Sequence, residues 1–200
     1  MDLLRSVKDL ARRRPPFGLV ECVLISIGLA LAFDSKWICD DGYIYFRYID
    51  NLLVRKIGLV FNPGEYVEGF TSPLWMLLLT AVRFVFRAAS PRHLTFVLSL
   101  ALAAAAFSFL AWINRRALRE AEPGLGGGRP ELNFFLPLVM AVSTRAIIDF
   151  STSGLSTPLV MLFAVLAAGE LLRTRERPVR AGLLAGLGPL VRPDLAIVSL

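Results

Sequence analysis

Blocks of apolar residues, several of them long enough to cross a bilayer, constrain this chain more than any other feature. The first block is "FGLVECVLISIGLALAF", residues 17–33, and it directly follows the basic stretch "RRRPP". A membrane-spanning helix needs about 20 predominantly apolar residues. Of this chain 56% is hydrophobic and only 19% is charged, whereas soluble domains carry about 25% charged residues. The sequence therefore predicts an all-α polytopic membrane helix bundle, with spans at 17–33, 94–113, 132–148, 157–172 and 181–191 and a last one that begins near 195.

The positions of the basic residues predict the orientation of these spans. The net charge of +6 would suit nucleic-acid binding, but most basic residues flank apolar blocks, so we expect no nucleic-acid partner. If the block 72–86 crossed the membrane, the arginine-rich segments 114–131 and 173–180 would lie outside. If it does not cross, both segments lie inside with the N-terminal tail, as the positive-inside rule requires. We therefore predict a multi-pass bacterial inner (plasma) membrane protein whose N-terminus is cytoplasmic.

This topology leaves one long outer (periplasmic) loop, residues 34–93. Within it, 72–86 is predicted to be an interfacial helix. The stretch "YIYFRYIDNLLVRK" has an apolar stripe at helical spacing, with Arg47, Asp50, Asn51 and Arg55 opposite it, which predicts an amphipathic helix lying on the membrane surface. The turn residues "NPG" then bring Glu68 and Thr71 back toward the membrane.

Two adjacent aspartates, Asp40 and Asp41, follow the first span in "ICDDGYIYFRY". Three interpretations are open: a helix boundary, a metal site or a catalytic base. Capping of a helix that starts near residue 43 accounts for one aspartate, and Asp41 has the better spacing for it. It does not account for a second charge beside the first, because adjacent like charges repel. We therefore expect Asp40 to face an active cavity.

Charged residues elsewhere have both structural and functional interpretations. Asp149 lies in the short outer loop 149–157, where it can cap a helix or serve the site. Arg192 and Asp194, at the outer end of a short span, can form a local ion pair or bind substrate. Glu21, one turn inside the first span, is expected to snorkel or to pair with the basic residues of the N-terminal tail, at positions 12–14.

Three segments together resemble a known family. The block "DDGYIYFRYIDNLLVRKIGLVFNPGEYVEGFTSPLWMLLL" resembles the first outer loop of the polytopic GT-C glycosyltransferases, and "STSGLSTPL" and "VRPD" support the resemblance. The chain is most similar to the bacterial branch that includes the mycobacterial terminal arabinofuranosyltransferases. The resemblance covers residue 17 to the end. Because family members are longer, we expect residues 1–200 to be the N-terminal part of a GT-C-like transmembrane domain, without the later spans or a C-terminal periplasmic domain.

The resemblance implies a cell-envelope glycosyltransferase. The donor would be a polyprenyl-phosphate sugar, and the acceptor a glycan or glycolipid at the outer membrane face. The first-loop acid of the family is a general base, which maps to Asp40 or Asp41, and relatives tend to use the first acid. The lipid-phosphate leaving group calls for a positive partner. Arg47, Arg192 and either Arg92 or His93 are candidates for it. The residues predicted to bind substrate are Arg47, Glu68, Thr71, Asp149, Arg192 and Asp194.

A divalent cation is the open question about cofactors. Some relatives place acidic residues of two outer loops around a metal, and Asp41, Glu68 and Asp149 match by position. Oxygen ligands of this kind would favour Mg, Mn or Ca. The second loop carries a single acid in "DFS", so the metal site stays undecided at this point.

Two other functions compete with the enzyme. A transporter or flippase fragment would have polar residues in the middle of its spans and broken, paired helices. The spans 94–113, 132–148 and 157–172 instead have almost purely apolar middles. The other alternative is a truncated, inactive glycosyltransferase homologue that acts as a membrane anchor or assembly factor.

Overall fold

The computed structural model describes residues 17–120, 135–172 and 178–199, and every regular element in these ranges is a helix. The predicted all-α class is therefore confirmed for the described residues. The predictions that concern 1–16, 121–134, 173–177 and 200, including the N-terminal basic tail, lie outside them. The helices are α2 (Phe17–Asp34), α3 (Asp40–Leu53), α4 (Pro73–Val85), α5 (Pro91–Glu120), α7 (Leu136–Ser143), α8 (Arg145–Phe150), α9 (Thr157–Leu171) and α10 (Pro178–Val191), followed by the 3₁₀ helix η1 (Pro193–Ser199).

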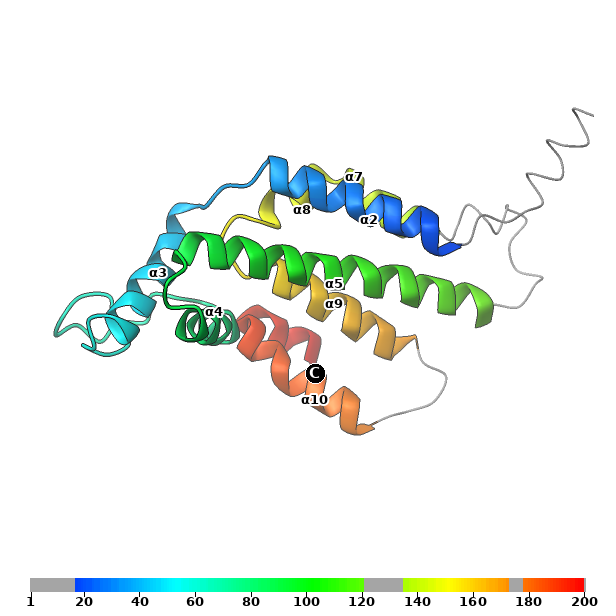
Figure 1. Ribbon diagram of the computed structural model, residues 1–200. Coiled ribbons are helices and arrows are strands. Elements are labelled where there is room, and N and C mark those ends of the chain that lie inside the picture. The colour runs from blue at the N-terminus through cyan, green and yellow to red at the C-terminus, as the bar shows by residue number, and fades with distance from the viewer. Residues whose placement is uncertain (1–16, 121–134, 173–177, 200) are drawn as a thin grey trace, which may run out of the picture.

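The longest helix, α5, lies at the centre of the molecule (Figure 1) and packs on α2, α4, α7 and α9. Its residues Pro91–Ala117 are long and apolar enough to cross a membrane, and among the described helices no other meets both conditions. Helices α4, α9 and α10 are apolar but shorter. Helices thus occupy the predicted spans, while the number of membrane crossings and their direction stay predictions.

A buried ion pair joins α2 to α5. Glu21 is only 2% exposed, and Arg115 donates from Nε to its Oε1 at 2.5 Å while Arg115 Nη2 pairs with Oε2. Glu21 is thus paired within the bundle by a residue from the far end of α5, which the local pattern did not indicate, while the predicted pairing with the basic tail lies outside the described residues. The N-terminal end of α2 and the C-terminal end of α5 therefore lie together.

The predicted span 132–148 is not one continuous helix over its described part, and whether it crosses the membrane stays a prediction. Helix α7 ends at Ser143, and Thr144 has an extended backbone with φ −81° and ψ 107° before α8 begins at Arg145. An extended residue cannot continue the i to i−4 hydrogen-bond ladder, so the chain changes direction here. The Thr144 hydroxyl donates to the Met140 carbonyl at 2.6 Å, which satisfies a carbonyl near the end of α7.

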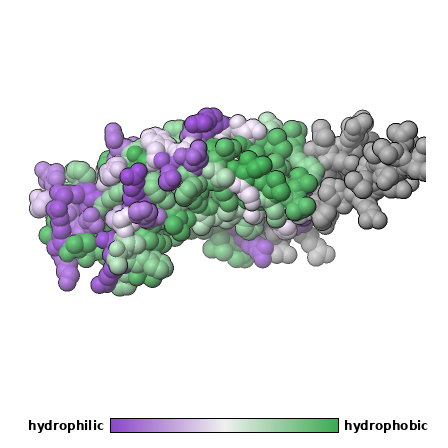
Figure 2. All heavy atoms as spheres, turned by 45° about the horizontal axis from the view of Figure 1, so that its top comes forward, coloured by the Kyte–Doolittle hydropathy of each residue, from purple (hydrophilic) through white to green (hydrophobic). Residues whose placement is uncertain are grey.

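Helices α3 and α4 gather at one end of the bundle. In Figure 1 α4 is seen along its axis while the long helices run across the picture, so α4 lies across the end of α5. The last turn of α2 and the first turn of α5 are at this same end. In Figure 2 hydrophilic residues gather here, whereas hydrophobic residues cover most of the visible face beside the long helices. The interfacial position of α4 stays a prediction.

The apolar face of α3 packs on protein. Tyr45, Tyr48 and Ile49 are buried in one core cluster with Trp75 and Met76 of α4. The prediction that this face lies on the membrane surface is therefore wrong, because α4 and the returning loop cover it.

Asn51 was also assigned to the wrong face of α3. It was expected on the polar side, opposite the stripe, but it is fully buried. Its amide donates to the Val60 carbonyl at 2.7 Å and to the Phe61 carbonyl at 3.0 Å. Asn51 is buried because its side-chain amide donates to these two loop carbonyls.

Candidate functional site

The two adjacent aspartates lie in the first turn of α3. The helix begins at Asp40, its N-cap is Cys39, and no side chain caps it. The prediction that Asp41 caps a helix starting near residue 43 is wrong, because the helix starts three residues earlier. Both carboxylates are exposed, and negative charge in a first turn is stabilised by the helix dipole. Neither side chain is used up by capping, so both are available to a ligand.

A buried loop, residues 151–156, holds the start of α3 in place. The backbone N–H of Cys39 donates to the Ser153 carbonyl at 2.9 Å, and the indole of Trp75 in α4 donates to the Gly154 carbonyl at 3.0 Å. The Thr152 hydroxyl donates to the Ala32 carbonyl in the last turns of α2 at 3.3 Å. One loop thereby ties together the elements that lead into and away from the aspartates.

Tyr45 lies one turn after Asp41 on α3, and three predicted site residues influence its hydroxyl. Burial raises the pKa of its hydroxyl, and the Thr71 side chain, the Ser72 backbone and the positive charge of Arg192 lower it by a smaller amount, while Asp41 raises it further. The phenol is therefore neutral around pH 7 and remains a hydrogen-bond donor. Tyr45 also shares a buried cluster with Val191, and its ring centroid lies 6.1 Å from that of Phe70. The residues that follow these two, Arg192 and Thr71, therefore lie near Tyr45.

Arg192 reaches this position because α10 is fastened to the start of α4. The buried Ser72 hydroxyl donates to the Val191 carbonyl at 2.6 Å, which fixes the next residue, Arg192, beside the N-terminus of α4. Arg192 Nε also pairs with Asp194 Oδ1 at 3.1 Å, and both side chains are exposed. The local ion pair considered from the sequence is thus present, and the arginine remains at the surface where an anion can reach it.

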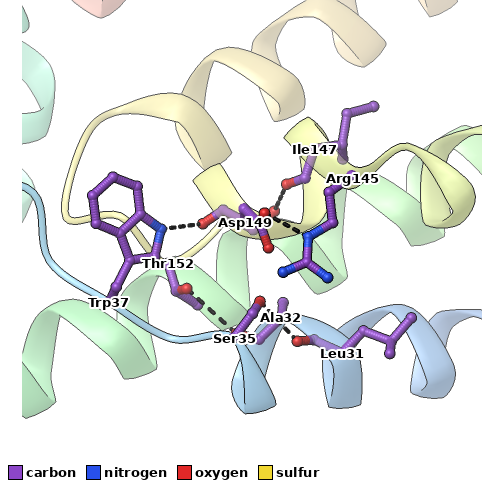
Figure 3. A network of polar contacts seen from close by, with 9 residues as sticks. Leu31, Ala32, Ser35, Trp37, Arg145, Ile147, Asp149 and Thr152 are labelled. Atoms are coloured by element: carbon purple, nitrogen blue, oxygen red, sulfur yellow. Dashed lines mark hydrogen bonds and ion pairs between the residues drawn. The ribbon is translucent and has the colours of Figure 1, made fainter.

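Asp149 belongs to a separate network, shown in Figure 3. It lies within α8 and pairs through Oδ2 with Arg145 Nε at 2.6 Å, while the Trp37 indole donates to its backbone carbonyl at 3.0 Å. The expectation that Asp149 caps a helix is wrong, because Asp149 is one residue from the C-terminal end of α8. Its Oδ1 is buried and accepts no hydrogen bond from the described residues.

Two other predicted substrate-binding residues point elsewhere. Arg47 Nε donates to the Phe61 carbonyl at 3.3 Å, so this side chain supports the loop after α3. Glu68 is exposed in the same loop, beside Val67, whose carbonyl accepts from the Tyr48 hydroxyl at 2.6 Å. Neither Arg47 nor Glu68 makes a hydrogen bond or ion pair with Tyr45, Asp41, Thr71 or Arg192 within the described residues.

The predicted metal ligands do not form a group. Within the described residues, no three His, Cys, Asp or Glu side chains lie close enough together to hold a metal ion. Asp41, Glu68 and Asp149 are on three different segments, and Asp149 is paired with Arg145. These acids were matched to the metal-binding acids of some relatives only by their position in the loops, and the structure does not bring them together.

Sequence reasoning missed Tyr45, Trp75 and Gly154. Tyr45 was assigned to an apolar stripe, where its hydroxyl gave no separate signal. Trp75 was part of an apolar block, although an indole N–H that is buried requires an acceptor. Gly154, with a positive φ of 86°, lies in a Ser/Thr/Gly run that is typical of a turn.

Comparison with known proteins supports a relationship to arabinosyltransferases. In an alignment 182 positions long that covers 84% of this chain, it is 31% identical to a protein named terminal beta-(1->2)-arabinofuranosyltransferase from Mycobacterium tuberculosis. It is 50% identical over 50 residues, 25% of its length, to a protein of the same name from Corynebacterium glutamicum. The chain spans 28% of the mycobacterial relative and the match covers 7% of the corynebacterial one. No family model and no solved structure matches it.

Proposed function

We propose that this chain forms the N-terminal part of a GT-C-type inverting glycosyltransferase at the outer face of the bacterial plasma membrane. It would move a sugar, of the arabinofuranose class named for its relatives, from a polyprenyl-phosphate donor to a cell-envelope glycan or glycolipid. The observation that carries this proposal is the placement of Thr71 and Arg192 near Tyr45 and Asp41: Tyr45 shares a buried cluster with Val191 and packs against Phe70, and the Ser72 hydroxyl donates to the Val191 carbonyl. An acid and a cation from separate segments, at the hydrophilic end of an apolar bundle, match the two charges that the reaction develops.

In the proposed reaction Asp40 is the general base. The acceptor hydroxyl oxygen bonds to the anomeric carbon of the donor as the bond from that carbon to the phosphate oxygen breaks. The hydroxyl proton goes to the carboxylate, and the bonding electrons leave with the phosphate. A positioned base of this kind contributes about 10²–10⁴-fold to the rate. A single displacement inverts the configuration at the anomeric carbon.

The two aspartates have different surroundings, which supports Asp40 as the base. Asp41 lies one turn before Tyr45 on α3, and its negative charge contributes to raising the pKa of the Tyr45 hydroxyl. Asp40 is exposed on the next face of the helix, and no hydrogen bond or ion pair within the described ranges engages its carboxylate. An exposed carboxylate that no described side chain engages is free to accept the proton of the acceptor hydroxyl.

Arg192 is the proposed partner of the donor phosphate. A phosphate ester that leaves with a negative charge is stabilised by a fixed cation placed where the charge develops, and a guanidinium matches phosphate oxygens in pairs. Thr71, exposed beside the cluster, is a hydroxyl that can orient the sugar or the phosphate. The bilayer beside the apolar helices would hold the polyprenyl chain.

The transporter alternative has one observation in its favour, the interruption between α7 and α8. A transport path made by broken helices calls for a paired break in the other half of a repeat. Within the described ranges, no second broken helix pairs with this one. The charged residues near the break, Arg145 and Asp149, pair with each other. Glycosyl transfer therefore explains more of the charged residues.

The test is a transfer assay in membranes that contain the expressed protein. We expect sugar transfer from a polyprenyl-phosphate donor, no transfer from a nucleotide sugar, and a product of inverted anomeric configuration by NMR. Arg192→Gln should raise the KM for the lipid-linked donor, whereas Arg180→Gln, at the opposite end of α10, should leave the KM unchanged. Equal use of a nucleotide sugar, or no effect of Arg192→Gln on the donor KM, would sink this proposal.

A further inference from the structure

Two glycines from distant segments meet where the aspartate helix begins. A Cβ added to Gly42 would lie 3.4 Å from the Ser153 carbonyl oxygen and 3.5 Å from Gly154 Cα. A Cβ added to Gly154 would lie 3.4 Å from Gly42 Cα. Two backbones in such close contact leave no room for side chains between them, so the position of α3 is set against the loop 151–156.

Ile38 is wedged against both glycines. Its Cγ2 would be 2.8 Å from a Cβ on Gly42 and 3.2 Å from a Cβ on Gly154. A separation of 2.8 Å between carbon atoms is well inside the 3.5–4.0 Å at which such contacts are favourable. Any side chain at residue 42 must therefore move Ile38, the helix start or the loop. The hydrogen bond from Cys39 N–H to the Ser153 carbonyl crosses the same contact.

The loop is held from its other side, so it cannot simply retreat. Ser151, Thr152 and Ser153 are fully buried, and the Trp75 indole donates to the Gly154 carbonyl. Gly154 itself has a positive φ of 86°, a conformation that only glycine adopts without cost. A displacement forced at the glycine contact is thus passed to the first turn of α3, which carries Asp40 and Asp41.

We propose that Ile38, Gly42 and Gly154 are positioning residues for the reaction, and that their contact sets where the Asp40 and Asp41 carboxylates stand relative to the acceptor. This proposal rests on the proposed glycosyl transfer. None of the three touches the reacting atoms: they act through the helix start. A misplacement of about 1 Å in a reacting group can lower a rate about 100-fold, which is the size of shift that a 2.8 Å contact would force.

The decisive variants are Gly42→Ala and its rescue. Gly42→Ala should lower kcat for sugar transfer about 100-fold with the donor KM unchanged, since Arg192 lies on another segment. Ile38→Ala/Gly42→Ala removes the clashing Cγ2 and should restore most of the lost kcat. Gly186→Ala is the matched control: it also adds a side chain within a helix, α10, but in open space, and should keep wild-type kcat. Wild-type kcat in Gly42→Ala, or failure of the double variant to regain activity, would overturn the proposal.

A second readout does not depend on activity. In a Cys22→Ser background, Ser153→Cys should form a disulfide with the native Cys39, because the backbone hydrogen bond from Cys39 N–H to the Ser153 carbonyl keeps the two Cα atoms within the range of about 4.4–6.8 Å that a disulfide spans. Adding Gly42→Ala should slow formation of this disulfide, and adding Ile38→Ala as well should restore it. An unchanged rate in the Gly42→Ala background would overturn the positioning role. If the disulfide rates are as expected but the wild-type protein transfers no sugar, the proposed function is refuted and the positioning contact stands.

Discussion

Removing Arg115 should strongly destabilise the protein, because Glu21, a buried charge between helices, would lose the partner that the described residues supply. The Glu21 side chain is 3% exposed and that of Arg115 is 29% exposed. Breaking a buried ion pair by removing one partner costs about 3–5 kcal/mol, and the partial exposure of Arg115 places this pair at about 3 kcal/mol. For a chain of this size 1 kcal/mol shifts Tm by about 2–4 °C. Arg115→Met should therefore lower Tm by about 6–12 °C.

A thermal-unfolding cycle in detergent tests this reasoning. The double variant Glu21→Leu/Arg115→Met replaces both charges with apolar side chains, which is often neutral or stabilising in a buried site, so its Tm should return close to that of the wild type. Arg55→Met, at an exposed position, serves as the control and should change stability by less than about 0.5 kcal/mol. A double variant less stable than Arg115→Met alone would refute the claim that an unpaired carboxylate causes the loss.

Three further results are expected. Trp75→Phe leaves the Gly154 carbonyl without its donor, which costs about 1–3 kcal/mol and should lower Tm; an unchanged Tm would show that another donor replaces the indole. Asn51→Leu removes the donors to the Val60 and Phe61 carbonyls and should speed protease cleavage in the loop after α3, whereas equal cleavage would contradict this role. Because burial raises the pKa of Tyr45, the contribution of its neutral phenol to stability is complete below pH 10 and is lost as pH rises through the higher folded-state pKa. The urea concentration at the unfolding midpoint should therefore fall at alkaline pH, and Tyr45→Phe should make this fall smaller. An equal fall in Tyr45→Phe would exclude Tyr45 as its cause.

The helices were predictable wherever local composition decides the structure. Apolar blocks at 17–33 and 157–172 became α2 and α9 with ends shifted by one residue, and the block 94–113 became the longer helix α5, Pro91–Glu120, because an apolar segment of that length satisfies its backbone most simply as a helix. The break at Thr144 was not predictable in this way. Neither glycine nor proline marks it, and the chain turns there to bring Asp149 beside Trp37.

The site was only partly predictable, since its contacts join residues far apart in the chain. Asp41, Thr71 and Arg192 were selected one by one from charge and resemblance, but nothing in their spacing indicated that Tyr45 would join them. The helix start at Asp40 depends on a hydrogen bond from Cys39 to Ser153, which capping statistics ignore. Glu21 likewise has a partner 94 residues away, whereas the local pattern offered the basic tail.

The proposed base can be tested most directly by single-turnover sugar transfer from the polyprenyl-phosphate donor in three variants. Asp40→Asn should slow transfer by about 10²–10⁴-fold with the donor still bound, and Asp41→Asn should slow it less. Asp34→Asn, exposed at the end of α2, should match the wild type. Full transfer rates in both Asp40→Asn and Asp41→Asn would contradict the account, because no carboxylate of this pair would then be taking the acceptor proton.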